Sequence, residues 1–409
     1  MTELTIVTGQ DDPDFLDLPW FAALDLWRTP RLVNLVIGSS RHVVKMVEYD
    51  DRVYAIKETT EALAKAEYAT LRELDELGIP TVAPVGYATG RFTPDGEALG
   101  AALITRFLDF SLPYGHLFAV ERPGFLRTKL LDAAVILLVR LHLAGVFWGD
   151  ASLNNVLFRR DAGGLMAYLV DAETTEIRPS LSAGMRQNDL DIARENVAGS
   201  LYDRIAAGSL DSSVDPVEIV DELQRRYDEL WTELTAPERM PATERWRIRQ
   251  RIDRIHALGF DVEELRVGTT GDWIEIQPRV VEEGHNHRRF QALTGLAIHE
   301  GQAREFLRAL FAHGALIEQR EGIRLPPEIV AQRWLVERYY PVVNAIPQQF
   351  RGTLEPAELF HSYMAHRDAI SREQGRDMEI DEALPSFIDH LLPVLPEERR
   401  ITDADAPVT

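Results

Sequence analysis

Two short stretches decide how this chain folds: Trp148-Gly149-Asp150-Ala151-Ser152-Leu153-Asn154-Asn155 and Leu169-Val170-Asp171-Ala172-Glu173. The second completes a hydrophobic run over 166–170 that predicts a strand. Together they offer a carboxylate that can orient a hydroxyl, and an amide oxygen and a second carboxylate suited to Mg²⁺. Asp and Asn are also common in turns, where their side chains bond to the local backbone. The pattern therefore gains its weight from what surrounds it.

A strand ending in lysine precedes these loops. Val53-Tyr54-Ala55-Ile56-Lys57 matches the V-A-I-K pattern whose lysine contacts the α- and β-phosphates of a nucleotide. Lysine is scarce among the 44 basic residues, since only Lys45, Lys57, Lys65 and Lys129 are lysines. A compact ammonium differs from a planar guanidinium at a phosphate site. We therefore predict that Lys57 binds phosphate; the alternative is a solvent-facing lysine on an edge strand.

The alanine-rich segment that follows has leucines at helical spacing, at positions 63, 71, 74 and 77, and ends at Gly78 and Pro80. Within this predicted helix, Glu67 is the first candidate partner for Lys57 and Glu73 is its competitor. For either one, the alternative is a solvated helical glutamate.

A turn rich in serine precedes the lysine strand. It contains Gly38, Ser39 and Ser40, whose N–H groups and hydroxyls can bind phosphate. An ordinary hairpin turn explains this segment equally well.

Taken together, these segments resemble the atypical kinase-like phosphotransferases, nearest in style to the lipopolysaccharide-core (Kdo/heptose) sugar kinases. Aminoglycoside-type phosphotransferases are more distant relatives. The resemblance runs from Asn34 to about Ala206, and 141–150 is similar to the lead-in of their catalytic loop. Trp148 stands where a His is usual, and Asp171-Ala172-Glu173 replaces Asp-Phe-Gly. The resemblance implies an α+β, two-lobed protein-kinase-like fold, with a small mixed β lobe and a larger helical lobe.

The resemblance also implies ATP and Mg²⁺ as cofactors and a role for each site residue. Asp150 is then the catalytic base or hydroxyl-orienting carboxylate, and Glu173 either joins the metal shell or lies on the surface. The remaining implied roles are phosphate binding by Lys57 with Glu67 as its partner, adenine binding by a hinge over 104–108 that includes Thr105 and Phe107, and metal binding by Asn155 and Asp171.

Little chain separates Asp171 from the next helix, which opens near Asp189 and Asp191. A long activation segment for docking peptides does not fit there, which favours a small hydroxylated acceptor, such as a sugar or glycoconjugate precursor. The alternatives are a protein kinase or other protein-modifying transferase, and a nucleotide-binding pseudokinase that acts on a partner. Either Asp189 or Asp191 resembles the aspartate that braces the catalytic loop; each also suits a helix N-terminus.

The chain divides by pattern into an N-terminal extension (1–30) expected to hold a short helix, a β lobe (31–109), a helical lobe (110–258), a C-terminal domain (259–396) and an acidic, disordered tail (397–409). The C-terminal domain, of unknown role as in actinobacterial relatives, is expected to begin with strands at 264–267 and 273–277 and continue as helices. A basic helix over 245–254 precedes it, and His285-Asn286-His287-Arg288-Arg289 opens a further helix. That segment is a metal-binding His pair, a cationic patch or a solvated surface.

Composition narrows the partners. The net charge of −22 disfavours nonspecific binding to nucleic acid or to anionic membranes. The absence of cysteine excludes disulfides and thiolate metal sites. The polar start lacks a signal peptide, and the apolar run at 133–139 is too short to cross a bilayer. We expect a cytoplasmic enzyme with a small-molecule hydroxyl acceptor, and a protein partner through the C-terminal domain remains open.

Overall fold

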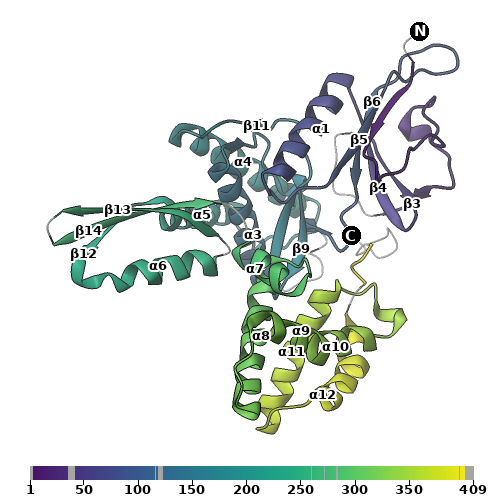
Figure 1. Cartoon of the computed structure of the whole chain (residues 1–409). Coiled ribbons are helices and arrows are strands. Elements are labelled where there is room, and N and C mark those ends of the chain that lie inside the picture. The colour runs from purple at the N-terminus through teal and green to yellow at the C-terminus, as the bar shows by residue number, and fades with distance from the viewer. Residues whose placement is uncertain are drawn as a thin grey trace. The chain divides into compact units, whose positions relative to one another are not determined.

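The computed structural model describes residues 3–35, 42–115, 117, 123–258, 260–270, 272–281, 284–395 and 397–400. The chain, drawn in Figure 1, forms two compact units. The first contains Met1–Phe158 and Ala167–Asp228, and the second contains Arg159–Met166 and Glu229–Arg400. The boundary expected at 259 falls inside the second unit. In the described part of the chain, no helix combines the length and apolarity that crossing a bilayer requires.

The first unit opens with a six-stranded sheet whose neighbours are all antiparallel. Its order is β1-β5-β6-β4-β3-β2, built from β1 (Thr5–Thr8), β2 (Leu32–Val33), β3 (Val44–Tyr49), β4 (Arg52–Thr59), β5 (Pro84–Thr89) and β6 (Ala101–Arg106). Asp50 and Asp51 both have positive φ, as a tight hairpin turn between β3 and β4 requires. Because β4 is an inner strand, Lys57 is flanked by Val44 and Leu103 rather than lying on an edge.

Helix α1 (Glu61–Glu76) follows β4, as its leucine spacing predicts. The Thr60 hydroxyl caps its N-terminus by accepting the Leu63 N–H, and Gly78 ends the turn with a φ of 76°. The buried face of α1 carries Glu67 among apolar residues. Helix phase therefore turns this carboxylate into the protein.

The N-terminal extension does not form the short helix expected of it, apart from one 3-10 turn at Leu24–Leu26. Its large side chains, including Phe15, Trp20 and Trp27, are instead buried in one core with the sheet. Buried Arg91 donates to the Trp20 and Ala22 carbonyls, which fixes the extension to the sheet. Burial of aromatic surface thus decides the path of this segment.

The second lobe of the first unit is mainly helical, with α3 (Pro123–Leu143), α4 (Ala183–Ala206) and the start of α5 (Pro216–Thr235). Residues 123–258 were expected to be helical, but they also hold short strands on either side of Asp150: β8 (Val146–Phe147), β9 (Val156–Asp161), β10 (Gly164–Leu169) and β11 (Glu176–Ile177). Strand β9 pairs with β7 (Leu112–Pro113) and β10, and β11 pairs with β8. A β lobe followed by a helical lobe confirms the predicted α+β, two-lobed architecture.

The second unit contains an antiparallel sheet and a helical bundle. The sheet has the order β12-β14-β13, from β12 (Glu238–Pro241), β13 (Asp261–Thr270) and β14 (Trp273–Val281), and α6 (Trp246–Ala257) lies between β12 and β13 in the chain. The bundle is built from α7 (His285–Thr294), α8 (Glu300–Glu321), α9 (Pro327–Trp334), α10 (Tyr340–Ala345), α11 (Pro356–Gln374) and α12 (Ile380–Ser386). Its core is aromatic, with Phe306 in ring contact with Phe290, Trp334 and Phe360.

The tip of the β9–β10 hairpin belongs to this second unit. Asp161 accepts the N–H groups of Gly301 and Gln302 in the first turn of α8, at 2.9 and 2.7 Å. Arg160 pairs with Glu398 at 2.7 Å. The prediction of disorder from 397 onward is therefore wrong for Glu398, which is buried because it neutralises Arg160.

Candidate active site

A cavity of about 540 Å³ lies within the first unit. One part of its wall is apolar and suits a flat ring: Val44, Met46, Ala55, Val82, Leu103, Phe107, Leu157 and Val170. The polar part includes the predicted site residues Lys57, Glu67, Thr105, Asp150, Asn155 and Asp171. Residues from distant parts of the sequence thus line one space.

Lys57 lies at the centre of a group of carboxylates. Its Nζ is 2.9 Å from Glu67 Oε2, 3.2 Å from Asp171 Oδ2 and 3.8 Å from Glu173 Oε2. Glu67 is only 1% exposed, whereas Glu73 lies on the exposed face of α1. The structure thus pairs Lys57 with Glu67.

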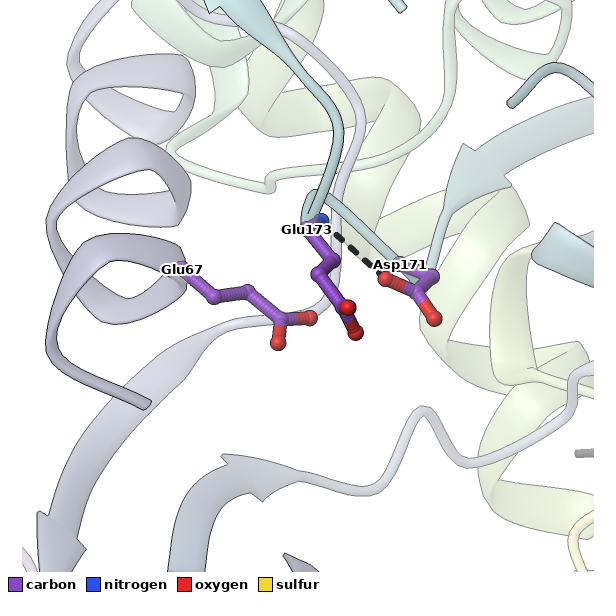
Figure 2. Close-up of side chains that lie close together, drawn as sticks. All are labelled: Glu67, Asp171 and Glu173. Atoms are coloured by element: carbon purple, nitrogen blue, oxygen red, sulfur yellow. Dashed lines mark hydrogen bonds between the residues drawn. The ribbon is translucent and has the colours of Figure 1, made fainter. Parts of the chain in front are cut away.

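The three carboxylates also fit a divalent cation. Figure 2 shows Glu67 reaching from α1 toward Asp171 and Glu173, and one oxygen of each residue lies within 4.8 Å of the others. The Glu173 N–H donates to Asp171 Oδ1 at 3.1 Å, which holds the segment after β10 in a turn. One ammonium cannot balance three carboxylates, so the group has an excess of negative charge that a cation would offset.

Burial and charge oppose each other at the Lys57–Glu67 pair. Burial lowers the pKa of Lys57, but the carboxylates of Glu67 and Asp171 outweigh it and raise that pKa above its usual value. Burial raises the pKa of Glu67 to about 7, although Lys57 acts in the opposite direction. The lysine is therefore held protonated beside a carboxyl group that titrates near neutrality.

Two amides hold the carboxylate of Asp150. The Asn155 Nδ2 donates to Asp150 Oδ2 at 3.2 Å and to the Asp150 carbonyl at 3.0 Å. The Asn196 Nδ2 donates to Asp150 Oδ1 at 3.0 Å. Because the NH₂ of Asn155 faces Asp150, its amide oxygen is left for another partner, such as a metal ion.

Asp189, and not Asp191, braces the loop that carries Asp150. The fully buried Asp189 carboxylate accepts the N–H groups of Trp148 and Gly149 at 2.7 and 2.8 Å, and its Oδ2 lies 3.1 Å from His142 Nε2. Gly149 has a φ of 80°, and a Cβ there would lie 2.9 Å from the Thr174 carbonyl oxygen. Asp191 is exposed and accepts from Gln187. The tight turn before Asp150 thus depends on a glycine and on a buried acid.

Trp148 connects two segments that carry candidate site residues. Its indole N–H donates to the Asp171 carbonyl at 3.3 Å, and its own carbonyl accepts the Thr174 hydroxyl at 2.9 Å. The ring is buried. This tryptophan therefore ties the loop that carries Asp150 to the segment that carries Asp171.

In the predicted hinge at 104–108, some backbone groups are already hydrogen-bonded within the protein and could not also bond to a base. Thr105 lies in the ladder of β6, and the Phe107 N–H already donates to the Val53 carbonyl at 2.9 Å. A contact from the hinge to adenine would therefore use the Phe107 carbonyl or the Leu108 N–H. Thr105 and Phe107 contribute side chains to the cavity wall.

Gly38, Ser39 and Ser40 lie outside the described residues. His42, which follows them, lines the cavity, and its Nε2 is 3.0 Å from Glu173 Oε2. Glu173 is therefore oriented by a residue from the β lobe as well as by Lys57.

The His285–Arg289 segment forms the start of α7 in the second unit. His285 stacks on His256 with ring centroids 3.9 Å apart, and the His287 N–H donates to Glu300. Arg289 lies over the Phe311 ring. Within the described ranges, the metal-compatible group of acids and histidines is the one at Glu67, so the His pair has no third ligand there.

One face of α4, which was not predicted from the sequence, also lines the cavity. This face carries Glu195, Asn196, Gly199, Ser200 and Asp203. A signal was present, because Asp189, Asn196 and Asp203 recur at i, i+7 and i+14 and so share one side of a helix. Polar residues that share a helix face with Asp189, which braces the loop carrying Asp150, are therefore candidates for contact with that loop.

Residues 43–197 match the model of the lipopolysaccharide kinase (Kdo/WaaP) family, and residues 229–392 match a domain of unknown function, DUF4032. Among solved structures, "WaaP in complex with acyl carrier protein" is similar at 18% identity. The match covers 48% of this chain and 90% of that one, with a TM-score of 0.32, too low to support an argument. No curated protein matches the chain.

Proposed function

Because this chain is a kinase-like protein that resembles the lipopolysaccharide kinase (Kdo/WaaP) family and carries an additional C-terminal domain, we propose that it is an ATP- and Mg²⁺-dependent phosphotransferase. Its acceptor is a hydroxyl of a small molecule, such as a sugar or glycoconjugate precursor. The observation that carries the proposal is the convergence of Lys57, Asp150, Asn155 and Asp171 on one cavity.

The nucleotide would bind against the apolar wall of the cavity and Lys57. A base would lie against the apolar residues that β3, β4, β6 and the hinge contribute to the cavity wall, including Phe107. Lys57 then contacts phosphate oxygens, and Glu67 keeps its ammonium in place through the 2.9 Å ion pair. A point charge of this kind suits phosphate without demanding a bidentate geometry.

The proposed metal site uses oxygen ligands that line the same cavity or lie close to Lys57. Asp171 and the Asn155 amide oxygen would hold Mg²⁺, and Glu173 would join them or orient the site through His42. When bound, Mg²⁺ neutralises the charge that develops on the transferred phosphoryl group.

The acceptor hydroxyl would be bound by Asp150. Its carboxylate accepts the hydrogen of the acceptor hydroxyl and aims the oxygen at the terminal phosphate. Because Asn155 and Asn196 hold both carboxylate oxygens, this group is oriented before the acceptor arrives.

The segment after Asp171 supports a small acceptor over a protein. It is short, since α4 already begins at Ala183, and β11 within it is paired to β8. A peptide substrate would need a docking platform in this position, and little chain is available to build one.

Screening ATP turnover against a metabolite extract tests the proposal, with mass spectrometry to identify the phosphorylated product. Wild type should form a product that Asp150→Ala does not, while the variant keeps its affinity for Mg·ATP within about threefold because Asp150 binds the acceptor and not the nucleotide. Equal loss of affinity and rate would indicate a structural role for Asp150. Binding of Mg·ATP without any turnover would favour a pseudokinase.

A further inference from the structure

Asn196 extends from α4 to the carboxylate of Asp150. Its Nδ2 donates to Asp150 Oδ1 at 3.0 Å and to the Ala151 carbonyl at 3.2 Å. On the other side, Asn155 donates to Asp150 Oδ2. Each carboxylate oxygen of Asp150 thus accepts an amide N–H, and the two amides come from separate segments of the chain.

From this geometry, and resting on the proposed phosphotransferase function, we infer that Asn196 is a positioning residue for phosphoryl transfer. It acts through Asp150, by holding the carboxylate in the orientation that receives the acceptor hydroxyl. A single hydrogen bond leaves a carboxylate free to rotate about the bond to its Cβ, whereas one bond to each oxygen fixes its plane.

The two amides have different surroundings. Asn155 is also a proposed Mg²⁺ ligand, whereas Asn196 is carried by α4, which is a continuous helix from Ala183 to Ala206. One oxygen of Asp150 is therefore held by a residue that has no part in the proposed metal site.

Helix α4 also determines where the loop itself lies. Asp189 binds the N–H groups of Trp148 and Gly149, and Asn196 follows on the same face of α4. One rigid element thus positions both the backbone of the loop and the side chain of Asp150. A shift of α4 would move the two together and preserve their relative geometry.

The same helix face leaves room for an acceptor. Gly199 and Ser200 follow Asn196 in the cavity wall. Apart from Gly199 itself, its chain neighbours and the nearby backbone of α4, no described heavy atom lies within 4 Å of where a Cβ on Gly199 would stand. The cavity is therefore open beside this part of α4, and Asp150 lines the same cavity.

Substitutions at Asn196 test the inference by steady-state Mg·ATP turnover, with water as the acceptor where no other is added. Asn196→Asp keeps the shape of the side chain but replaces the N–H donor with a carboxylate beside Asp150. Asn196→Ala removes both the side chain's shape and its donor. Each should lower kcat by about 10- to 100-fold, the usual range for a lost hydrogen bond to a charged group, with the KM for ATP unchanged within about twofold. Asn196→Gln keeps an amide donor and should recover part of the rate.

Asn188→Ala provides the matched control, because Asn188 is an exposed asparagine on the same helix. It should leave kcat and KM at their wild-type values. Wild-type kcat in Asn196→Asp would overturn the inference while leaving the proposed function intact. Turnover in Asp150→Ala equal to that of wild type would overturn the proposed function instead.

A structural readout separates the two questions even if no turnover is found. Crystal structures of wild type and Asn196→Ala, both with Mg·ATP, should show the Asp150 carboxylate rotated away from its wild-type orientation in the variant. An unmoved carboxylate would mean that Asn155 alone positions Asp150, and the inference would then be wrong.

Discussion

Lys57 and Glu67 form an ion pair of 2.9 Å in which the glutamate is almost fully buried and the lysine also contacts Asp171. The pair links β4 to α1, and through Asp171 it reaches the segment that follows the β9–β10 hairpin. The stability of the lobe and the geometry of the candidate site are therefore coupled at one buried carboxyl group.

Glu67 should make the free protein less stable as pH rises through neutrality. Its pKa is raised from 4.5 to about 7 in the folded state, so the folded protein binds more protons than the unfolded chain between these values. The free energy of unfolding should fall over this window, by on the order of 1–3 kcal/mol. Urea unfolding at pH 5 and pH 7.5 should show this loss in wild type and a smaller one in Glu67→Gln. Glu73→Gln, on the exposed face of the same helix, should behave as wild type.

Asp171→Ala should remove the effect of Mg²⁺ on nucleotide binding. In wild type, ATP with Mg²⁺ should raise the melting temperature more than ATP with EDTA does, since saturating ligand at about 100 times its Kd stabilises by about 2.7 kcal/mol. The variant should respond equally with and without Mg²⁺. Asp75→Ala, an exposed acid on α1, should keep the wild-type difference. A Mg²⁺-dependent shift that survives in Asp171→Ala would exclude Asp171 from the metal site.

Lys57→Arg should be a poor enzyme despite its conserved charge. The planar guanidinium cannot occupy the place of an ammonium that lies within 4 Å of three carboxylates without moving them. Turnover should fall by about tenfold or more. Lys65→Arg, on the exposed side of α1 where Lys65 pairs with Glu61, is the control and should retain full activity. Full activity in Lys57→Arg would show that Lys57 serves only as a generic cation.

Asp161→Ala should loosen the start of α8 in the second unit. The variant loses two hydrogen bonds from the N–H groups of Gly301 and Gln302 to a partly buried carboxylate, worth on the order of 2 kcal/mol. Hydrogen exchange measured by mass spectrometry should become faster in peptides that cover the first turns of α8. Asp389→Ala, at an exposed position of the same unit, should not change their exchange. Unchanged protection in Asp161→Ala would show that α8 needs no cap from the hairpin.

The sequence by itself determined the local elements and the order of the site residues. The strand that ends near Lys57, the helix that follows it and the loop that carries Asp150 and Asn155 are all encoded by short-range periodicity and turn chemistry. These signals depend on neighbouring residues alone, so they can be read without any knowledge of packing. They do not extend to the N-terminal extension, whose aromatic residues find their partners on a sheet formed later in the chain.

Only the tertiary structure decided which of several chemically equal residues face the site. Glu67 and Glu73 both lie on α1, and Asp189 and Asp191 both lie on α4, but in each pair the phase of the helix against its neighbours buries the first and exposes the second. Asn196 reaches Asp150 only because α4 packs against the catalytic loop. Such choices depend on long-range contacts, whose partners are distant in the sequence and are brought together by burial of the shared core.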